Sequence, residues 1–384
     1  MAQVVNQRSV SPTVAVIIST MHDRILKGYY PAGTWLPSER DLANEFSVSR
    51  ILIRAAIKEL EESKLIVCNA HHRPRVANIS PSNRKKSRNG TKSLALWISP
   101  NPQWPGTVMI MKGIQEAAAG DWRVVLGSPV GENKADIKAS EIRFLQQIHQ
   151  DNDVEGLIIS CMGGADSVPE LKALQSLNIP LVFIDHLPPK GILGDYVGVN
   201  NKKSMEKAVR SLFLLGHYNI AYVSNFDEFS TVTDREDGYK NALKFAGLKF
   251  RPEMMEIDPG PSSEDQYEGC ESLVERLLSL PSPPTAIACV NDTTAYRVIS
   301  AIKKFGLNVP EDISVMGFDG VERWMPNPPF LTTSHQPFDS IGSHAMELLL
   351  ERYEAETVFP SRHIILETTF ISNSSTISVS NSKL

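Results

Sequence analysis

The sequence predicts a multidomain protein in which a small α+β domain precedes a larger α/β domain built on parallel sheets. Its 384 residues exceed what one ordinary hydrophobic core holds, so two or three compact units are expected. Apolar residues recur at helical spacing as far as residue 60. Beyond residue 92, short apolar runs alternate with amphipathic helical patterns, which is typical of parallel sheets covered on both faces.

The composition is that of a soluble globular protein, with 42% hydrophobic and 22% charged residues. No apolar run approaches the roughly 18 residues of a membrane span, and the first ten residues lack the apolar core of a signal peptide. We therefore expect a cytoplasmic protein. The cysteines are scattered without a CxxC pair, which argues against a disulfide framework or a zinc site: Cys68, Cys161, Cys270 and Cys289.

Charge is divided unevenly along the chain. The first 92 residues hold 15 Lys and Arg against 7 Asp and Glu, whereas the remainder holds 24 against 37. A basic head on an acidic body indicates that the head alone meets a polyanion. An ordinary solvated surface would explain the basic residues but not their segregation. The charge therefore favours a nucleic acid as the partner of the head.

Three helices are expected in the head. The first has an apolar repeat that stops at Gly28: Val14, Ile17, Ile18, Met21 and Ile25. Ser38 and Asp41 are a plausible capping pair for the second helix. Ser49 caps the third, whose inward positions are Leu52, Ile53, Ala56, Ile57 and Leu60.

A β-hairpin follows the helices. Residues 65–68 and 75–77 are predicted to be its two strands, which completes a winged helix-turn-helix outline over residues 1–77. Residues 78–92 contain Pro, Gly, Ser and five basic residues without an acid, which is the composition of a linker. The body then extends from residue 93 to residue 384.

Arg50 and Arg54 lie one helical turn apart at the start of the third helix, on its exposed face. In a helix-turn-helix, this part of the helix enters the major groove, where Arg bonds guanine or phosphate. Arg40, beside the start of the second helix, could reach the DNA backbone. The alternative is that these arginines form surface ion pairs, with Asp41, Glu45 or Glu59 as partners.

The head resembles the GntR family of bacterial transcription regulators across residues 21–77. The matching residues are Gly28, Tyr30, Pro31, Gly33, the block 36–40, Leu42, Ala43, the block 48–50, Arg54 and Leu60. The resemblance implies that Arg40, Ser49, Arg50 and Arg54 lie against operator DNA, and that the wing tip, with His72 and Arg73, reaches the neighbouring minor groove. This tip is bulkier than the glycine-rich tip usual in the family. Cys68, His71 and His72 lack a fourth ligand, so we expect no metal there.

In the body, polar side chains follow two predicted strands. Asn291 follows the strand of residues 284–290, and Asp319 follows the strand of residues 312–318. Because parallel sheets bind ligands beyond the carboxyl ends of their strands, Asn291 is expected to bond a ligand. Asp292 is expected to cap the following helix instead.

Residues 93–376 resemble the effector domain of LacI-type repressors. The motifs that carry the resemblance are 284–292, 310–319, Gly216-His217 and Arg235 before Gly238-Tyr239. It implies a two-lobed, periplasmic-binding-protein-like fold, with lobe 1 about 93–199 and 318–336, lobe 2 about 200–317 and 337–384, and crossovers near Asn200, Gly317 and Gln336. The implied effector cleft contains Asn101, Trp104, Asp185, Arg235, Asn291, Asp319 and Gln336.

These residues also have plainer interpretations. Asp185 and Asp319 could cap helices, and Arg235 could pair with its neighbours Glu236 or Asp237. As a cleft, the set suits a neutral polyhydroxylated ligand, so a sugar is expected and a purine remains the alternative. The chain has residues 258–260, Asp-Pro-Gly, where family members often offer an aromatic side chain. A stacking ring must therefore come from Trp104, Phe226 or Trp324.

The sequence thus predicts a homodimeric transcription regulator, expected to be a repressor, whose operator affinity a small effector controls. No nucleophile elbow, phosphate loop or HExxH motif is present, so neither enzyme activity nor a cofactor is expected. Two alternatives stay open. One is a DNA-binding head fused to a pyridoxal-phosphate enzyme, whose Schiff-base lysine we do not find. The other is a ligand-binding module that has lost DNA recognition.

Overall fold

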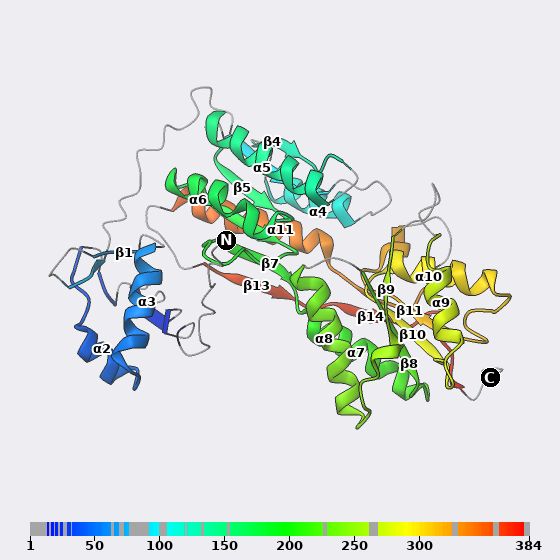
Figure 1. Ribbon diagram of the computed structural model, residues 1–384. Helices are drawn as coiled ribbons and strands as arrows, with labels where there is room; N and C mark the ends of the chain where they lie inside the picture. The colour runs from blue at the N-terminus through cyan, green and yellow to red at the C-terminus, as the bar shows by residue number, and fades with distance from the viewer. Residues whose placement is uncertain are drawn as a thin grey trace, which may run out of the picture.

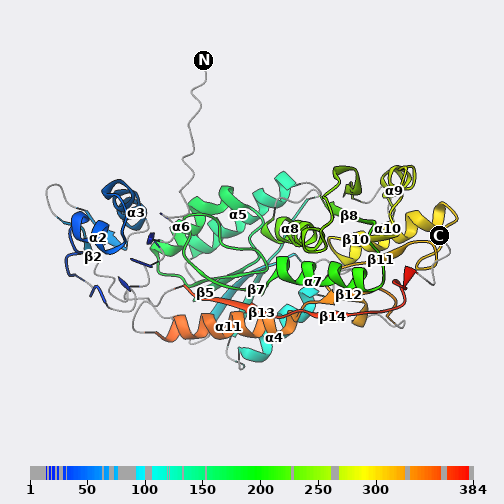
Figure 2. The same cartoon turned by 90° about the horizontal axis from the view of Figure 1, so that it is seen from below.

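The computed structural model describes residues 14, 17–18, 20–21, 24–25, 29–31, 33–62, 65–68, 73–76, 92–99, 106–118, 120, 122–131, 134–151, 154–225, 229–260, 268–324, 329–355 and 361–379. A helical head with a small hairpin stands at one end of an elongated body (Figure 1). The body consists of two sheets covered by helices, and the chain passes between them more than once (Figure 2). No described helix could cross a membrane.

The head has the predicted winged helix-turn-helix core. Helix α2 (Glu39–Glu45) begins at Ser38, whose hydroxyl accepts a hydrogen bond from the Asp41 backbone N–H, as the capping pair predicts. Helix α3 (Arg50–Glu62) follows, and strands β1 (Ile66–Val67) and β2 (Arg75–Val76) pair antiparallel as the wing. The buried side chains include Leu42 of α2 and most of the positions expected from the periodicity, whereas Ile18 and Leu52 are only partly buried. The expected positions that are buried are Val14, Ile17, Met21, Ile25, Ile53, Ala56, Ile57 and Leu60.

Lobe 1 is a six-stranded parallel sheet in the order β13-β7-β6-β5-β3-β4. The strands are β3 (Lys92–Trp97), β4 (Trp122–Gly127), β5 (Gly156–Ile159), β6 (Leu181–Ile184), β7 (Asp195–Val199) and β13 (His363–Leu366). Alternate residues feed two separate cores, as period-2 strands require. One face carries α4 (Gly106–Ala117) and α11 (Phe338–Glu354); the other carries α5 (Lys134–Asp151) and α6 (Val168–Ser176).

Lobe 2 is a four-stranded parallel sheet in the order β11-β10-β8-β9. Its strands are β8 (Ile220–Asn225), β9 (Met255–Asp258), β10 (Ala286–Cys289) and β11 (Ser314–Met316). Helices α7 (Asn201–Leu214) and α8 (Ser230–Phe245) cover one face, and α9 (Glu271–Leu278) and α10 (Asp292–Lys304) cover the other. Beside this lobe, β12 (Thr333–His335) pairs antiparallel with β14 (Thr369–Ile371).

The C-terminal third of the chain divides between the lobes differently from the expectation. Residues 318–336 lie with lobe 2, because Met316 of β11 bridges Thr332, just before β12, and Asp319 bridges His335 of β12. Helix α11 and strand β13 belong to lobe 1, where the helix packs on α4 and the strand pairs with β7. The crossovers near Asn200 and Gln336 are confirmed. The third lies between β13 and β14, so the prediction of Gly317 was wrong.

One smaller expectation is also corrected. Lys92, assigned to the linker, is the first residue of β3, and its ammonium lies over the rings of Trp122 and Tyr353. After β14, the described residues up to 379 form no further strand. They pack on lobe 2, where the Ser375 carbonyl accepts from Val315 N–H.

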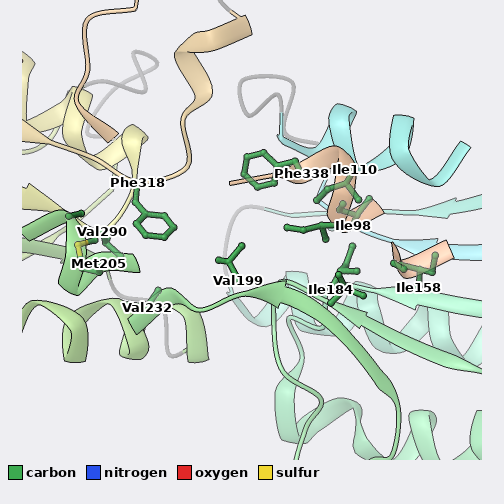
Figure 3. Close-up of a cluster of buried hydrophobic side chains, with 14 of the residues drawn as sticks. Ile98, Ile110, Ile158, Ile184, Val199, Met205, Val232, Val290, Phe318 and Phe338 are labelled. Carbon is green, nitrogen blue, oxygen red and sulfur yellow. The ribbon is translucent and has the colours of Figure 1, made fainter. Parts of the chain in front are cut away.

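One hydrophobic cluster runs through both lobes (Figure 3). Ile98, Ile184 and Phe338 lie on the lobe 1 side, and Val290 and Phe318 lie on the lobe 2 side. Val199, the last residue of β7 before the first crossover, lies between them in the view. The crossovers are therefore anchored in apolar packing on each side, which favours movement of the lobes as rigid bodies about these strands.

Candidate functional site

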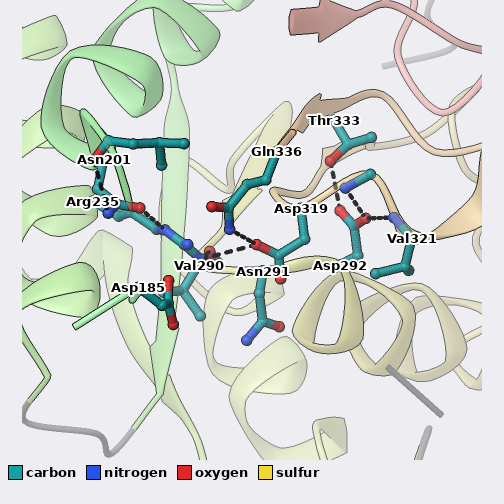
Figure 4. Close-up of polar contacts among 12 residues, drawn as sticks. Asp185, Asn201, Arg235, Val290, Asn291, Asp292, Asp319, Val321, Thr333 and Gln336 are labelled. Atoms are coloured by element: carbon teal, nitrogen blue, oxygen red, sulfur yellow. Dashed lines mark hydrogen bonds and ion pairs between the residues drawn. The ribbon is translucent and has the colours of Figure 1, made fainter. Parts of the chain in front are cut away.

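Arg235 of α8 is the centre of a buried polar cluster where the lobes meet (Figure 4). Its Nε donates to Asn201 Oδ1 at 2.8 Å, and one terminal nitrogen donates to the Val290 carbonyl at 3.0 Å. The same nitrogen lies 3.4 Å from Asp319 Oδ1, and the guanidinium stacks 3.9 Å from the centroid of the Phe318 ring. The expected alternative partners, Glu236 and Asp237, pair with lysines instead.

Asp319 is held in an unusual conformation. It is a non-glycine residue with φ +119° directly after β11, in a region that costs backbone free energy. Its Oδ1 accepts from Gln336 Nε2 at 2.8 Å, and its N–H donates to the Ser334 carbonyl. Tertiary contacts therefore overcome the local strain and keep the carboxylate beside Arg235.

The partners of this ion pair sit at the crossovers. Asn201 begins α7, immediately after the chain has left β7 of lobe 1. Gln336 follows β12, two residues before α11 begins in lobe 1. The Arg235–Asp319 pair is thus bonded to two of the three places where the chain changes lobes. Any molecule that competes for these groups acts directly at the hinge.

Asn291, and not Asp292 as expected, caps α10. Asn291 is the N-cap of α10, where its Oδ1 accepts from Thr294 N–H at 2.8 Å. Asp292 is fully buried and accepts from Gly320 N–H, Val321 N–H and the Thr333 hydroxyl at 2.7 to 2.9 Å. It ties the segment after β11, which includes Asp319, to β12. The prediction that Asp292 caps the helix was wrong, and the ligand role of Asn291 stays a prediction.

Asp185 follows β6 with φ +62°, and its side chain is 24% exposed. The Tyr196 hydroxyl donates to its backbone carbonyl at 3.0 Å. The charges of Asp185 and Arg235 both act on this hydroxyl, whose pKa is raised chiefly by burial. Asp185 therefore lies close to the buried cluster, on the lobe 1 side.

An aromatic pair joins the lobes beside Asp185. His186 stacks on Phe229, which precedes α8, with ring centroids 4.2 Å apart. Residues 258–260, Asp-Pro-Gly, contain no aromatic ring. Asp258 itself is buried in an ion pair with Arg297 at 2.8 Å. Asn101, Trp104 and Phe226 lie outside the described residues, as does the side chain of Trp324. Sequence reasoning missed Asn201, His186 and Phe229, which belong to no recognisable motif, and it did not single out Phe318 within the motif 310–319.

In the head, Arg50 is exposed and forms no ion pair with any described residue. Arg54 pairs with Glu39 at 2.8 Å, and Arg40 lies 3.9 Å from Asp41, so each has a surface ion-pair partner, and their DNA contacts stay a prediction. The carbonyl of Ser49 accepts from the first N–H groups of α3. Arg73 is exposed on the wing, whereas His72 lies outside the described residues. Ile51, beside Arg50, is an apolar side chain that is 75% exposed, and the sequence pattern did not single it out.

Two further features were tested as sites. Within the described part of the chain, no group of three His, Cys, Asp or Glu side chains could hold a metal ion. A surface hollow of about 450 Å³ lies at the outer edge of lobe 2, and its lining includes Glu256 and Arg276. These two side chains satisfy each other in a bidentate pair at 2.6 and 2.9 Å. Glu256 and Arg276 are therefore occupied with each other in this hollow, and the candidate site is the polar cluster at the hinge.

Two family models match the chain. Residues 14–73 match the model described as bacterial regulatory proteins of the gntR family, and residues 209–376 match the periplasmic binding protein-like domain. Both resemblances expected from the sequence are confirmed at this level.

Individual proteins are also similar. The transcriptional repressor CytR of Escherichia coli K12 is 29% identical over 281 residues, 72% of this chain and 77% of CytR. PurR of Vibrio vulnificus is 33% identical over 204 residues, 52% of this chain and 58% of PurR. Among solved structures, a LacI family transcriptional regulator of Enterococcus faecium with bound ribose aligns with a TM-score of 0.62 and 22% identity. That alignment covers 75% of this chain and all of the other, and it supports the fold alone.

The Asp292 carboxyl gives the body a pH dependence. Burial and the neighbouring Asp319 carboxylate raise the pKa of Asp292 to about 8, although its three hydrogen bonds act in the opposite direction. The folded protein therefore keeps a proton that the unfolded chain releases near pH 4. The resulting stabilisation is present in acid and is lost as the pH rises through about 8.

We expect Asp292→Asn to flatten this dependence, because the amide can accept from both N–H groups and donate to the Thr333 hydroxyl. Urea unfolding midpoints at pH 6 and pH 9 measure the effect. Asp166→Asn, at an exposed carboxylate paired with Lys138, is the control. An equal loss of stability between the two pH values in wild type and Asp292→Asn would contradict the assignment.

Proposed function

We propose that this chain, which joins a GntR-type head at residues 14–73 to a periplasmic-binding-protein-like body, is a transcriptional repressor controlled by a small molecule. The observation that carries the proposal is the buried Arg235–Asp319 pair, bonded to residues at two crossovers between the lobes. A molecule that engages this pair changes the free energy of lobe closure, and the head responds. CytR and PurR are named repressors, which supports the direction of control.

The head is the DNA-binding part of the proposal. The unpaired Arg50 and the apolar Ile51 project from the start of α3, where they suit a guanine edge and a thymine methyl group. Arg40, Arg54 and Arg73 are also exposed in the head and suit phosphate contacts. A protein that acts on operator DNA works in the cytoplasm of a bacterial cell. A head that retains sequence preference for genomic fragments excludes the alternative of a module without DNA recognition.

The effector is proposed to be neutral and rich in hydroxyl groups. The charges of Arg235 and Asp319 cancel, and the raised pKa of Asp292 leaves that carboxyl largely protonated near pH 7. The carboxylate of Asp185 then makes the net charge of the site negative, which disfavours anionic ligands. Carboxylate, amide and guanidinium groups together bond hydroxyls well. A sugar is therefore proposed first, with a nucleoside or purine as the alternative that a ligand panel decides.

A homodimer is proposed because lobe 1 ends in an exposed apolar edge. Strand β4 is the edge strand of the sheet, and Val124, Val125 and Leu126 are 39%, 39% and 45% exposed. Val130 after this strand and Val108 on α4 are also exposed. Natural edge strands are usually covered or charged, so this edge suits a second copy of the chain. Two paired bodies would set the spacing of two heads on an operator.

The proposal describes a binding protein and not an enzyme. The named relatives are regulators, and the buried carboxyls of the site are all engaged in hydrogen bonds that hold the fold. No exposed nucleophile stands beside them among the residues described.

Arg50→Ala is expected to weaken specific DNA binding by about 1 to 3 kcal/mol, because the bidentate base contact is lost. Selection of genomic fragments by the wild type supplies the DNA, and fluorescence anisotropy at fixed salt gives the affinities. Arg143→Ala removes the same charge from an exposed site in the body and serves as the control. Unchanged specific affinity in Arg50→Ala would refute the base-reading role.

Asp319→Asn is expected to abolish effector binding, since it removes the charge that orients Arg235 but keeps an acceptor for Gln336. Thermal shifts with D-ribose, cellobiose, adenosine and cytidine test this, because a ligand at a hundred times its dissociation constant stabilises by roughly 2.7 kcal/mol. Asp166→Asn in lobe 1 is the control. The variant should still bind DNA. A full ligand-induced thermal shift in Asp319→Asn would show that Asp319 is not part of the effector site.

Leu126→Asp is expected to convert the dimer to a monomer, because it places a buried charge in the proposed interface. Sedimentation velocity measures the mass directly. Leu214→Asp introduces the same charge at a side chain in lobe 2 that is 89% exposed, so it should not change the mass. A dimer that survives Leu126→Asp would place the interface elsewhere.

A further inference from the structure

The loop that joins β6 to β7, residues 185–194, touches two distant parts of the molecule. Its first residues lie at the boundary between the lobes, and Leu193 near its end packs against the hydrophobic core of the head. We propose that this loop is a docking surface for the head and carries the effector signal to it. The inference rests on the proposed function for its biological meaning, although its structural part stands independently.

At its first end, the loop contacts lobe 2. His186 stacks on Phe229 at 4.2 Å, and Leu187 N–H lies 3.5 Å from the Ser230 hydroxyl at the start of α8. Helix α8 also carries Arg235. His186 is nine-tenths buried at this contact, and its Nδ1 has no hydrogen-bond partner among the described residues. A rotation of lobe 2 therefore moves or breaks contacts made by this end of the loop.

At its far end, the loop is fixed to lobe 1 and meets the head. Ile192 is buried in the core beneath α5 and α6, and Gln175 Nε2 donates to the Leu193 carbonyl at 2.5 Å. The Leu193 side chain is half-buried against the cluster that holds the head together. Both views place the head beside the α6 end of lobe 1 (Figures 1 and 2).

The loop between these ends is braced, so it can transmit a displacement. Ile192 N–H donates to the Pro189 carbonyl at 3.0 Å, which closes a turn, and Pro188 and Pro189 restrict the backbone. A Cβ at Gly194 would lie 2.5 Å from the Phe183 ring, so the loop returns to β7 in close contact with β6. The ten residues of this stiff loop thus connect the hinge to the head, along a path separate from the segment that joins head and body in sequence.

The contact has a consequence for the head. While Leu193 is seated, the head has a fixed orientation and part of its core is covered by the body. Loss of the contact leaves the head tethered only by the chain, with faster local opening. Movement of lobe 2 about the crossovers shifts the loop and so changes the population of docked heads.

Hydrogen exchange of the full-length protein tests the docking. We expect Leu193→Asp to speed exchange of the amides in α2 and α3 by about tenfold or more, because the head loses its seat. Leu214→Asp, the same substitution at an exposed site in lobe 2, should leave the head unchanged. Slow exchange in β3 and β5 verifies that lobe 1 stays folded. Unchanged exchange of the head in Leu193→Asp would overturn the docking.

The transmission is tested by combining variants. Phe229→Ala should alter head exchange in the wild-type background and have no further effect in Leu193→Asp. Ser230→Ala, which removes only the hydroxyl near Leu187, is a milder version should Phe229→Ala disturb lobe 2. No effect of either variant on the head, or an effect that persists in Leu193→Asp, would refute the loop route. The measurement needs neither DNA nor effector, so its failure is distinct from failure of the proposed function.

Discussion

A single buried ion pair holds together the part of lobe 2 from which the chain crosses to lobe 1. Arg235 and Asp319 are almost fully removed from water, and two charges are stable there only while they face each other and their hydrogen bonds are satisfied. Asn201 and Gln336 supply those bonds from the crossovers, and Asp292 fixes the segment that carries Asp319. Breaking the pair leaves uncompensated buried charge. A ligand that takes the place of one partner must therefore supply a compensating charge or hydrogen bonds of its own.

Much of the fold followed from the sequence. The short apolar runs beyond residue 92 became parallel strands, and the capping pair at Ser38 was correct, because both signals are local. The assignment of α11 and β13 was not predictable in the same way. Their periodicity predicts that they are buried, but it does not predict against which sheet. That choice depends on long-range packing such as that of α11 on α4, where Gly113 and Gly342 allow close backbone approach.

The site was predicted in part. Arg235, Asp319 and Gln336 were expected in one cleft and do come together, whereas the cap of α10 is Asn291 and not Asp292. Either side chain can accept from a helix N-terminus, and the choice was decided by Gly320, Val321 and Thr333, which lie far along the chain. Asn201 and His186 were missed for a similar reason, since each acquires meaning only from a partner on another segment.

The three crossovers impose an order on biosynthesis. Lobe 1 lacks the helix that covers one of its faces until the ribosome has passed Glu354, and its edge strand β13 comes later still. Lobe 2 is interrupted in the same way, because Ser375 completes contacts with Val315 and Phe330. Neither lobe can finish folding while the nascent chain is incomplete, so apolar surface of both sheets stays exposed to solvent during synthesis. A truncated polypeptide from a premature stop codon would yield two unfinished lobes rather than one finished half.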